Sequence, residues 1–125
     1  MLNRISSTPM LAVKDVARAR RFYEDTLGLA AEPNGMDDIL QYRAGGTSFV
    51  VYPSEYAGTN QATALTWTVG DRLDHEVEEL RRKGVTFEHY DLPGTVRKGD
   101  IHESGPIRNA WFKDPDGNIH ALSSV

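Results

Sequence analysis

The stretch that decides the fold is Trp111-Phe112-Lys113-Asp114-Pro115-Asp116-Gly117-Asn118-Ile119-His120-Ala121-Leu122. Its centre, Asp-Pro-Asp-Gly, predicts a tight hairpin turn, because the first Asp accepts backbone N–H bonds, proline presets φ, and glycine adopts the left-handed conformation. Two strands are therefore expected to meet here, over residues 107–113 and 118–123.

Length and composition favour one small domain. The chain has 125 residues, a net charge of −4 and no cysteine, which excludes thiol nucleophiles, zinc–thiolate sites and iron–sulfur clusters and disfavours nucleic-acid partners. Residues 1–8 lack the apolar core of a signal peptide, and no apolar run is long enough to span a membrane. We therefore expect a cytoplasmic protein without a membrane partner.

Working outward from the hairpin, the same order of elements occurs twice. Each half begins with a strand and a helix that ends at a glycine, and irregular segments lie at 54–62 and 91–106. Asp15 and Asp71 are the expected helix N-caps. The expected strands are 9–13, 29–33, 38–44 and 47–52 in the first half, and 64–69, 85–90 and the closing hairpin in the second.

The two halves form an internal repeat of 56 positions. One such unit cannot cover both faces of its own sheet, so two are expected to pair into one larger curved sheet with the helices outside. The concave inner face is then the default binding site. Val13, Asp15 and Gly28 recur in the second half as Val69, Asp71 and Gly84.

Three motifs together resemble the vicinal oxygen chelate superfamily, which includes glyoxalase I, bleomycin-resistance proteins, extradiol dioxygenases and fosfomycin-resistance enzymes. They are the segments 22–29, 83–85 and 112–118. The resemblance implies an α+β fold of two βαβββ modules, at about 1–53 and 63–125, in a single domain with a curved mixed sheet. It also implies a homodimer.

Enzymes of this superfamily hold a divalent metal with His, Gln or Glu side chains from four strands. The resemblance places the four positions at Thr8, Val50, Ala64 and Ala121. None of these side chains is an ordinary ligand for such a cation, since only Thr8 has an oxygen. We therefore expect no metal and no other cofactor.

The concave face is then expected to be apolar with scattered hydroxyls. In fosfomycin-type relatives, the residues three and five positions before the first Asp of the turn reach the ligand, which implies that Trp111 and Asn109 do so here. An alternative is that Trp111 only fills the core. The expected ligand-binding residues are Trp111, Asn109, Tyr52, Met10, Thr66 and Ser48.

The histidines allow a different interpretation. His120 lies on the outward face by strand alternation, which favours a structural role. His89 ends a strand, whereas His102 lies beside Asp100 and Glu103 in the segment 91–106. His102, Glu103 and His89 are therefore candidate catalytic groups.

The sequence thus predicts a metal-independent protein that encloses an apolar or aromatic small molecule. Two alternatives stay open. One is a lyase, isomerase or dioxygenase whose catalytic groups have moved to His89, His102 and Glu103. The other is an interaction module whose concave face is filled by side chains.

Overall fold

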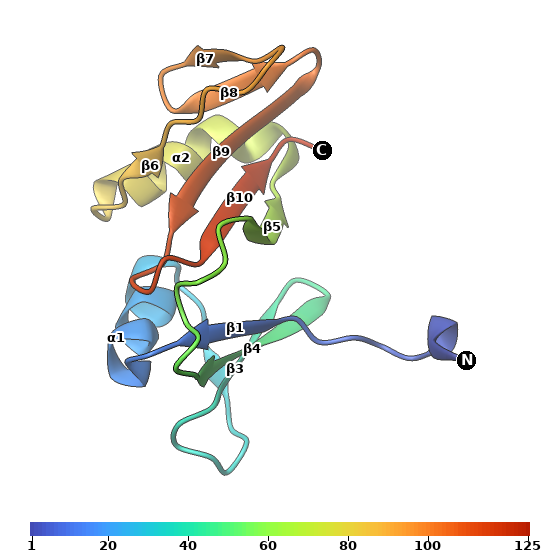
Figure 1. The fold of residues 1–125 in the computed structure, drawn as a ribbon, viewed down its shortest axis with the longest axis vertical. Coiled ribbons are helices and arrows are strands. Elements are labelled where there is room, and N and C mark those ends of the chain that lie inside the picture. The colour runs from blue at the N-terminus through green and yellow to red at the C-terminus, as the bar shows by residue number, and fades with distance from the viewer.

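The computed structural model describes residues 1–125, which form two modules with the same topology. In the first module the sheet order is β1-β4-β3-β2, and in the second it is β5-β10-β9-β8-β7, with β6 also paired to β9. The first strand of each module pairs in parallel with the last, and the other neighbours are antiparallel. Figure 1 shows the modules one above the other.

The α+β fold of two modules predicted from the sequence is confirmed, with one refinement. Each module has its own hydrogen-bonded sheet, so the backbone ladder is not continuous from one module to the other. The strands of the first module are β1 (Met10–Val13), β2 (Ala31–Glu32), β3 (Leu40–Ala44) and β4 (Thr47–Pro53). Those of the second are β5 (Thr63–Thr68), β6 (Phe87–Glu88), β7 (Val96–Lys98), β8 (Ile101–Ser104), β9 (Ile107–Lys113) and β10 (Ile119–Ser123).

The first helix begins as the sequence predicts. The Asp15 carboxylate accepts a hydrogen bond from the Arg18 amide at 3.1 Å and caps α1 (Val16–Arg20). The helix continues as a π-helical segment, η2 (Arg21–Thr26), and the chain then turns at Gly28, whose φ is +76°.

The second helix begins differently. A 3₁₀ turn, η3 (Gly70–Arg72), precedes α2 (Leu73–Arg82), and no side chain caps either element. The expectation that Asp71 caps this helix is therefore wrong, because Asp71 is part of the 3₁₀ turn that precedes the α-helix. The apolar side of α2 lies against β9 and β10, where Leu73, Val77 and Leu80 are buried.

The segment 91–106 is not the long loop that its glycine and proline content indicates. Its second half forms the hairpin β7–β8, and β8 pairs with β9. Within this segment, only residues 91–95 lie outside these strands and the turns that connect them. The hairpin was not predicted because all three residues of β7 are exposed and show no apolar alternation.

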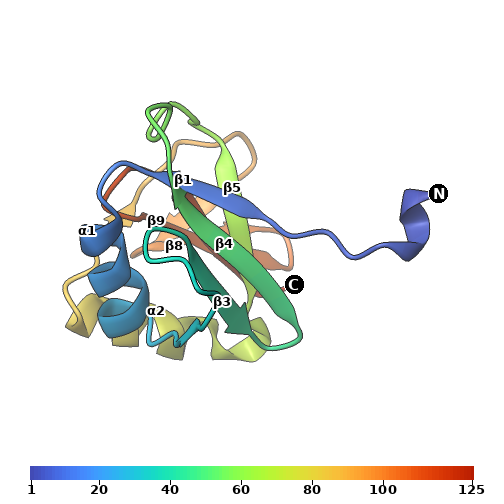
Figure 2. The same cartoon turned by 90° about the horizontal axis from the view of Figure 1, so that it is seen from below.

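Each module has its own hydrophobic core, and the two cores share side chains across their boundary. Phe22 and Leu27 of the first module pack on the second core, and Leu65 of β5 packs on the first. Trp67 contacts both. A short 3₁₀ turn, η1 (Leu2–Arg4), lies in an N-terminal arm that extends away from both modules (Figure 2). None of the helices is long and apolar enough to span a membrane.

Candidate functional site

Strand register places five side chains, among them two rings and one amide, on one face of the second sheet. Ala121 of β10 pairs with Trp111 of β9, and Ser123 pairs with Asn109. Asn109 also pairs with His102 of β8. Because directly paired residues point to the same side of a sheet, these five side chains share a face, opposite to that of α2.

A pocket of about 230 Å³ opens on this face beside Trp111. The indole Nε1–H donates to the Thr63 hydroxyl oxygen at 3.2 Å, which fixes the plane of the ring. Most of the wall is apolar, and it contains no charged side chain. The residues that line it are Gln61, Ala62, Thr63, Tyr90, Leu92, Trp111 and Ile119.

Tyr90, His102 and Trp111 form an aromatic cluster at the back of this pocket. The centroid of the Trp111 ring lies 5.4 Å from that of Tyr90 and 4.9 Å from that of His102, both in edge-to-face geometry. The Tyr90 backbone N–H donates to Nε2 of His102 at 2.9 Å. His102 is only 2% exposed, and burial, together with the nearby His89, lowers the pKa of its imidazole.

His102 and Glu103 do not come together. Neighbouring residues of a strand point to opposite faces, and Glu103 pairs with Lys98 at 3.2 Å and Arg108 at 3.4 Å. His102 and Glu103 therefore do not form one acid–base group.

His89 instead meets Asp100. Its Nε2 lies 2.7 Å from Asp100 Oδ1, and Arg81 holds the other carboxylate oxygen. The hydrogen bonds from Arg81 and His89 lower the pKa of the Asp100 carboxyl. His89 itself is about half exposed and borders a second pocket of about 310 Å³ with Tyr90 and Arg97.

The other expected ligand-binding residues lie outside the Trp111 pocket. Met10 is exposed on β1, and Thr66 is exposed on β5. Ser48 and Tyr52 are half-buried on β4, in the first module. The candidate site therefore belongs to the second module rather than to the concave faces of both modules.

The four positions at which relatives hold a metal have unsuitable side chains in this fold. Val50 and Ala64 are half-buried, Ala121 is buried, and all three end in methyl groups. Thr8 is exposed and offers one neutral oxygen. This donor set does not fit a divalent cation, which requires carboxylate, imidazole or several oxygen ligands.

A buried hydrogen-bond chain that sequence analysis missed links the two modules. The Tyr23 hydroxyl donates to Asp114 Oδ2 at 2.7 Å and lies 3.0 Å from His120 Nε2. The Trp67 indole donates to His120 Nδ1 at 3.0 Å. Because indole nitrogen can only donate, the neutral His120 ring carries its proton on Nε2, and this N–H donates to the Tyr23 hydroxyl oxygen.

His120 therefore has a structural role, as its expected outward face indicates. It is fully buried, its ring stacks on that of Phe112 at 4.9 Å, and burial lowers its pKa to about 4. The sequence does not reveal this series of hydrogen bonds, because Tyr23 lies more than ninety residues from both Asp114 and His120.

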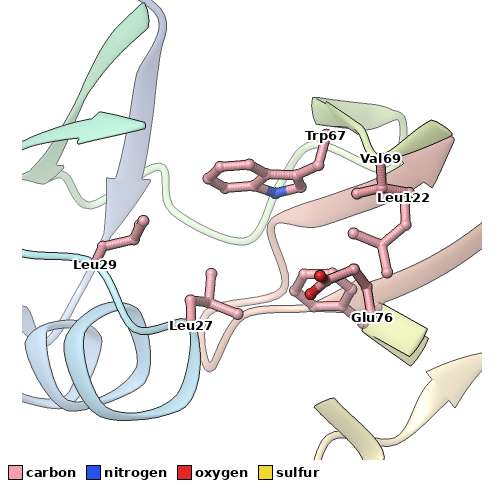
Figure 3. A pocket seen from close by; sticks show the side chains of 7 residues that line it. Leu27, Leu29, Trp67, Val69, Glu76 and Leu122 are labelled. Carbon is pink, nitrogen blue, oxygen red and sulfur yellow. The ribbon is translucent and has the colours of Figure 1, made fainter. Parts of the chain in front are cut away.

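A smaller apolar pocket of about 110 Å³ lies between the modules on the helix side (Figure 3). Figure 3 shows the Trp67 indole extending across it, with Glu76 on the opposite wall. This volume is well below that of a usual ligand site, and most of its walls are core side chains. The residues that line this pocket are Leu27, Leu29, Trp67, Val69, Glu76, Phe112 and Leu122.

Two paired modules with the helices outside and a pocket on one sheet face define a class of small α+β domains. The family model of the Glyoxalase/Bleomycin resistance protein/Dioxygenase superfamily matches residues 3–122, and the chain belongs to this superfamily. No curated protein matches the sequence.

Solved structures with the same fold have different named roles. An integron cassette protein from the mobile metagenome of the Halifax Harbour sewage outfall has a TM-score of 0.69 at 16% identity, covering 97% of this chain and 100% of its own. The fosfomycin resistance protein FosX of Mesorhizobium loti has a TM-score of 0.66 at 14% identity, covering 96% and 91%. A lactoylglutathione lyase of Agrobacterium tumefaciens has a TM-score of 0.68 at 13% identity, covering 95% and 92%. At these identities the likeness shows the fold alone.

Proposed function

We propose that the chain is a metal-independent protein that binds an apolar or aromatic small molecule beside Trp111. The observation that carries this proposal is the pocket of about 230 Å³, whose aromatic wall is held in place by the bond from Trp111 to Thr63. An apolar cavity with a fixed aromatic ring and few polar groups is the usual construction of a small-ligand site.

The side chains at the positions that the resemblance equates with metal ligands support the proposal that binding needs no metal. Val50, Ala64 and Ala121 offer no donor atom to a cation. The binding energy must then come from burial of apolar surface and from hydrogen bonds.

Thermal denaturation with a panel of one- and two-ring aromatic compounds tests the proposal. A ligand at about one hundred times its Kd adds roughly 2.7 kcal/mol to the unfolding free energy and raises Tm by several degrees. Trp111→Ala is expected to weaken binding at least tenfold, whereas Tyr56→Ala, at an exposed site outside the pocket, leaves it unchanged.

A metal titration separates this proposal from a conventional member of the superfamily. Ni²⁺, Zn²⁺, Mn²⁺ and Fe²⁺ are expected to leave Tm unchanged, because the chain lacks their ligands. Stabilisation of the fold by micromolar metal, or a Trp111→Ala variant that binds the aromatic compounds as tightly as the parent, would contradict the proposal.

A second candidate function is a lyase or isomerase, and one contact favours it. Asp100 is 2.7 Å from His89 and orients its imidazole at the edge of the pocket of about 310 Å³. Such a pair can move a proton. His89→Ala should then abolish turnover of glyoxalase-type or epoxide substrates without loss of fold; an inactive parent protein removes support for this candidate.

We further propose that the protein acts as a cytoplasmic homodimer. Edge strands β1 and β5 each have an unpaired side. Leu2 and Ile5 expose apolar side chains on the N-terminal arm. Light scattering after size-exclusion chromatography should give twice the mass of one chain, and a monomer at micromolar concentration would contradict the dimer.

A further inference from the structure

Two polar groups of the aromatic cluster are buried without a hydrogen-bond partner. They are the Tyr90 hydroxyl and Nδ1 of His102. A buried polar group that lacks a partner destabilises a fold, and most such groups in native proteins are paired. Two of them beside the same indole ring therefore require an explanation.

Both groups are hydrogen-bond donors. Nε2 of His102 accepts the backbone N–H of Tyr90 at 2.9 Å, so this nitrogen carries no proton. The neutral ring then holds its proton on Nδ1, which has no hydrogen bond of normal geometry, although the backbone of Asn109 and Asp100 lies close enough to offset part of the fall in the ring's pKa that burial causes. The tyrosine hydroxyl can donate as well as accept, so a single acceptor oxygen could take a hydrogen bond from each of the two groups.

The two donors flank Trp111, which forms a wall of the pocket. Tyr90 lines that pocket, whereas His102 does not line it but meets the indole edge to face, with its ring centroid 4.9 Å away. Because both donor atoms are buried, a molecule stacked on Trp111 would reach them only after Tyr90 and the segment that carries it move.

The segment that covers these donors has few bonds of its own. Residues 90–95 make one internal backbone hydrogen bond, from the Thr95 amide to the Leu92 carbonyl, and one to His102 through the Tyr90 amide. Pockets of about 230 and 310 Å³ lie on its two sides, and Tyr90 lines both. A shift of this segment would expose the donors to a molecule in either pocket.

The surrounding charge favours a neutral partner. Glu88 pairs with Trp111 in the strand register, and burial, together with the Glu88 carboxylate, raises the pKa of the Tyr90 hydroxyl. Lys113, the nearest cation, is held by Glu88 at 3.3 Å. No free positive charge lines the pocket beside Trp111, so a carboxylate would be disfavoured there.

We propose that the ligand of the Trp111 pocket is a ring compound with a neutral carbonyl oxygen. The Tyr90 hydroxyl and the Nδ1–H of His102 donate to that oxygen once residues 90–95 shift. This inference rests on the proposed function and adds the chemical class of the ligand and the two groups that select it.

A matched pair of probes tests the inference: 1-indanone, which has a carbonyl, and indane, which lacks it. The parent protein should bind 1-indanone about tenfold more tightly than indane. In Tyr90→Phe the preference should fall, through loss of affinity for 1-indanone alone, because only the His102 donor remains. Tyr56→Phe, at an exposed site, is the control and should retain it.

The same variant gives a second measurement that needs no ligand. Because Tyr90→Phe removes a buried hydroxyl that has no partner, Tm of the free protein should rise by about 3 °C. A tyrosine with an ordinary structural hydrogen bond would give a fall instead. Nitrogen-15 NMR of His102 should show a proton on Nδ1 and none on Nε2.

Each failure has a distinct meaning. Equal affinities for the two probes, both reduced by Trp111→Ala, would overturn the carbonyl inference and leave the proposed function standing. Binding of neither probe would count against the proposed function itself. A lower Tm in Tyr90→Phe, or a proton on Nε2 of His102, would overturn the inference whatever the probes do.

Discussion

Acidification from pH 7 to pH 5 should destabilise this protein through His120. In the unfolded chain an imidazole has a pKa of about 6.5, whereas burial lowers the pKa of His120 to about 4 in the folded protein. Between these values the unfolded state binds more protons, so the unfolding free energy falls as the pH falls. The loss from pH 7 to pH 5 amounts to about 2 kcal/mol.

Urea denaturation at the two pH values measures this loss, and His120→Gln identifies its source. Glutamine can accept from Trp67 and donate to Tyr23 but does not titrate, so the variant should lose the His120 share, about 2 kcal/mol, of the pH dependence despite lower stability at pH 7. His102 and Asp100, whose pKa values are also lowered, keep their own contributions in the variant. His75→Gln, which changes an exposed histidine on α2, should behave like the parent. A parent protein equally stable at pH 5 and pH 7, or the same slope in His120→Gln, would refute the reasoning.

Three further substitutions test the turn that begins at Asp114 and the connector residue Gly58 that lies against it. Asp114→Asn should lower the unfolding free energy by about 2–3 kcal/mol in urea denaturation, because its buried carboxylate accepts four hydrogen bonds; an unchanged midpoint would show that the carboxylate is dispensable. Gly58→Ala would place a methyl group 2.9 Å from the Asp116 carbonyl oxygen at a φ of +83° and should cost about 2 kcal/mol or more. Gly35→Ala has a similar φ of +74° with open space around it and should cost about 1 kcal/mol, so equal losses in the two variants would contradict the steric argument.

The parts of the fold that could be predicted from sequence are those set by local chemistry. The Asp114 carboxylate accepts the amides of Asp116 and Asn118 at 2.9 Å, and Gly117 has a φ of +90°, as the turn motif predicts. The strand before this turn, 107–113, has the expected bounds.

Prediction was poorer where pairing with distant residues decides the structure. The strand expected over 85–90 is reduced to Phe87–Glu88, since only these residues pair with β9. The hairpin β7–β8 depends on the same strand. A window of sequence does not contain this information, because an exposed strand without apolar alternation resembles a loop.

The candidate site could be predicted only in part, because some of its residues lie on regular strands and others do not. The resemblance to fosfomycin-type relatives implied Trp111 and Asn109 as ligand contacts, and strand register places both on the face opposite the helix. The pocket opens beside Trp111, whereas Asn109 does not line it. Tyr90 gives no such signal, because it follows a two-residue strand and reaches the indole through an irregular segment. Its position can be obtained only from the folded chain.

The turn between β9 and β10 serves both halves of the duplicated chain. The Asn118 side chain donates to the Ala12 carbonyl at 2.8 Å, the Asp116 carboxylate accepts the Lys14 amide at 3.0 Å, and Asp114 accepts the Tyr23 hydroxyl. Although the repeat implies an ancestor with a single unit, these bonds between the units lead us to expect that neither present-day unit folds alone. A gene cut within the connector should yield two fragments that regain structure only when mixed, and later evolution of either half is constrained by the other.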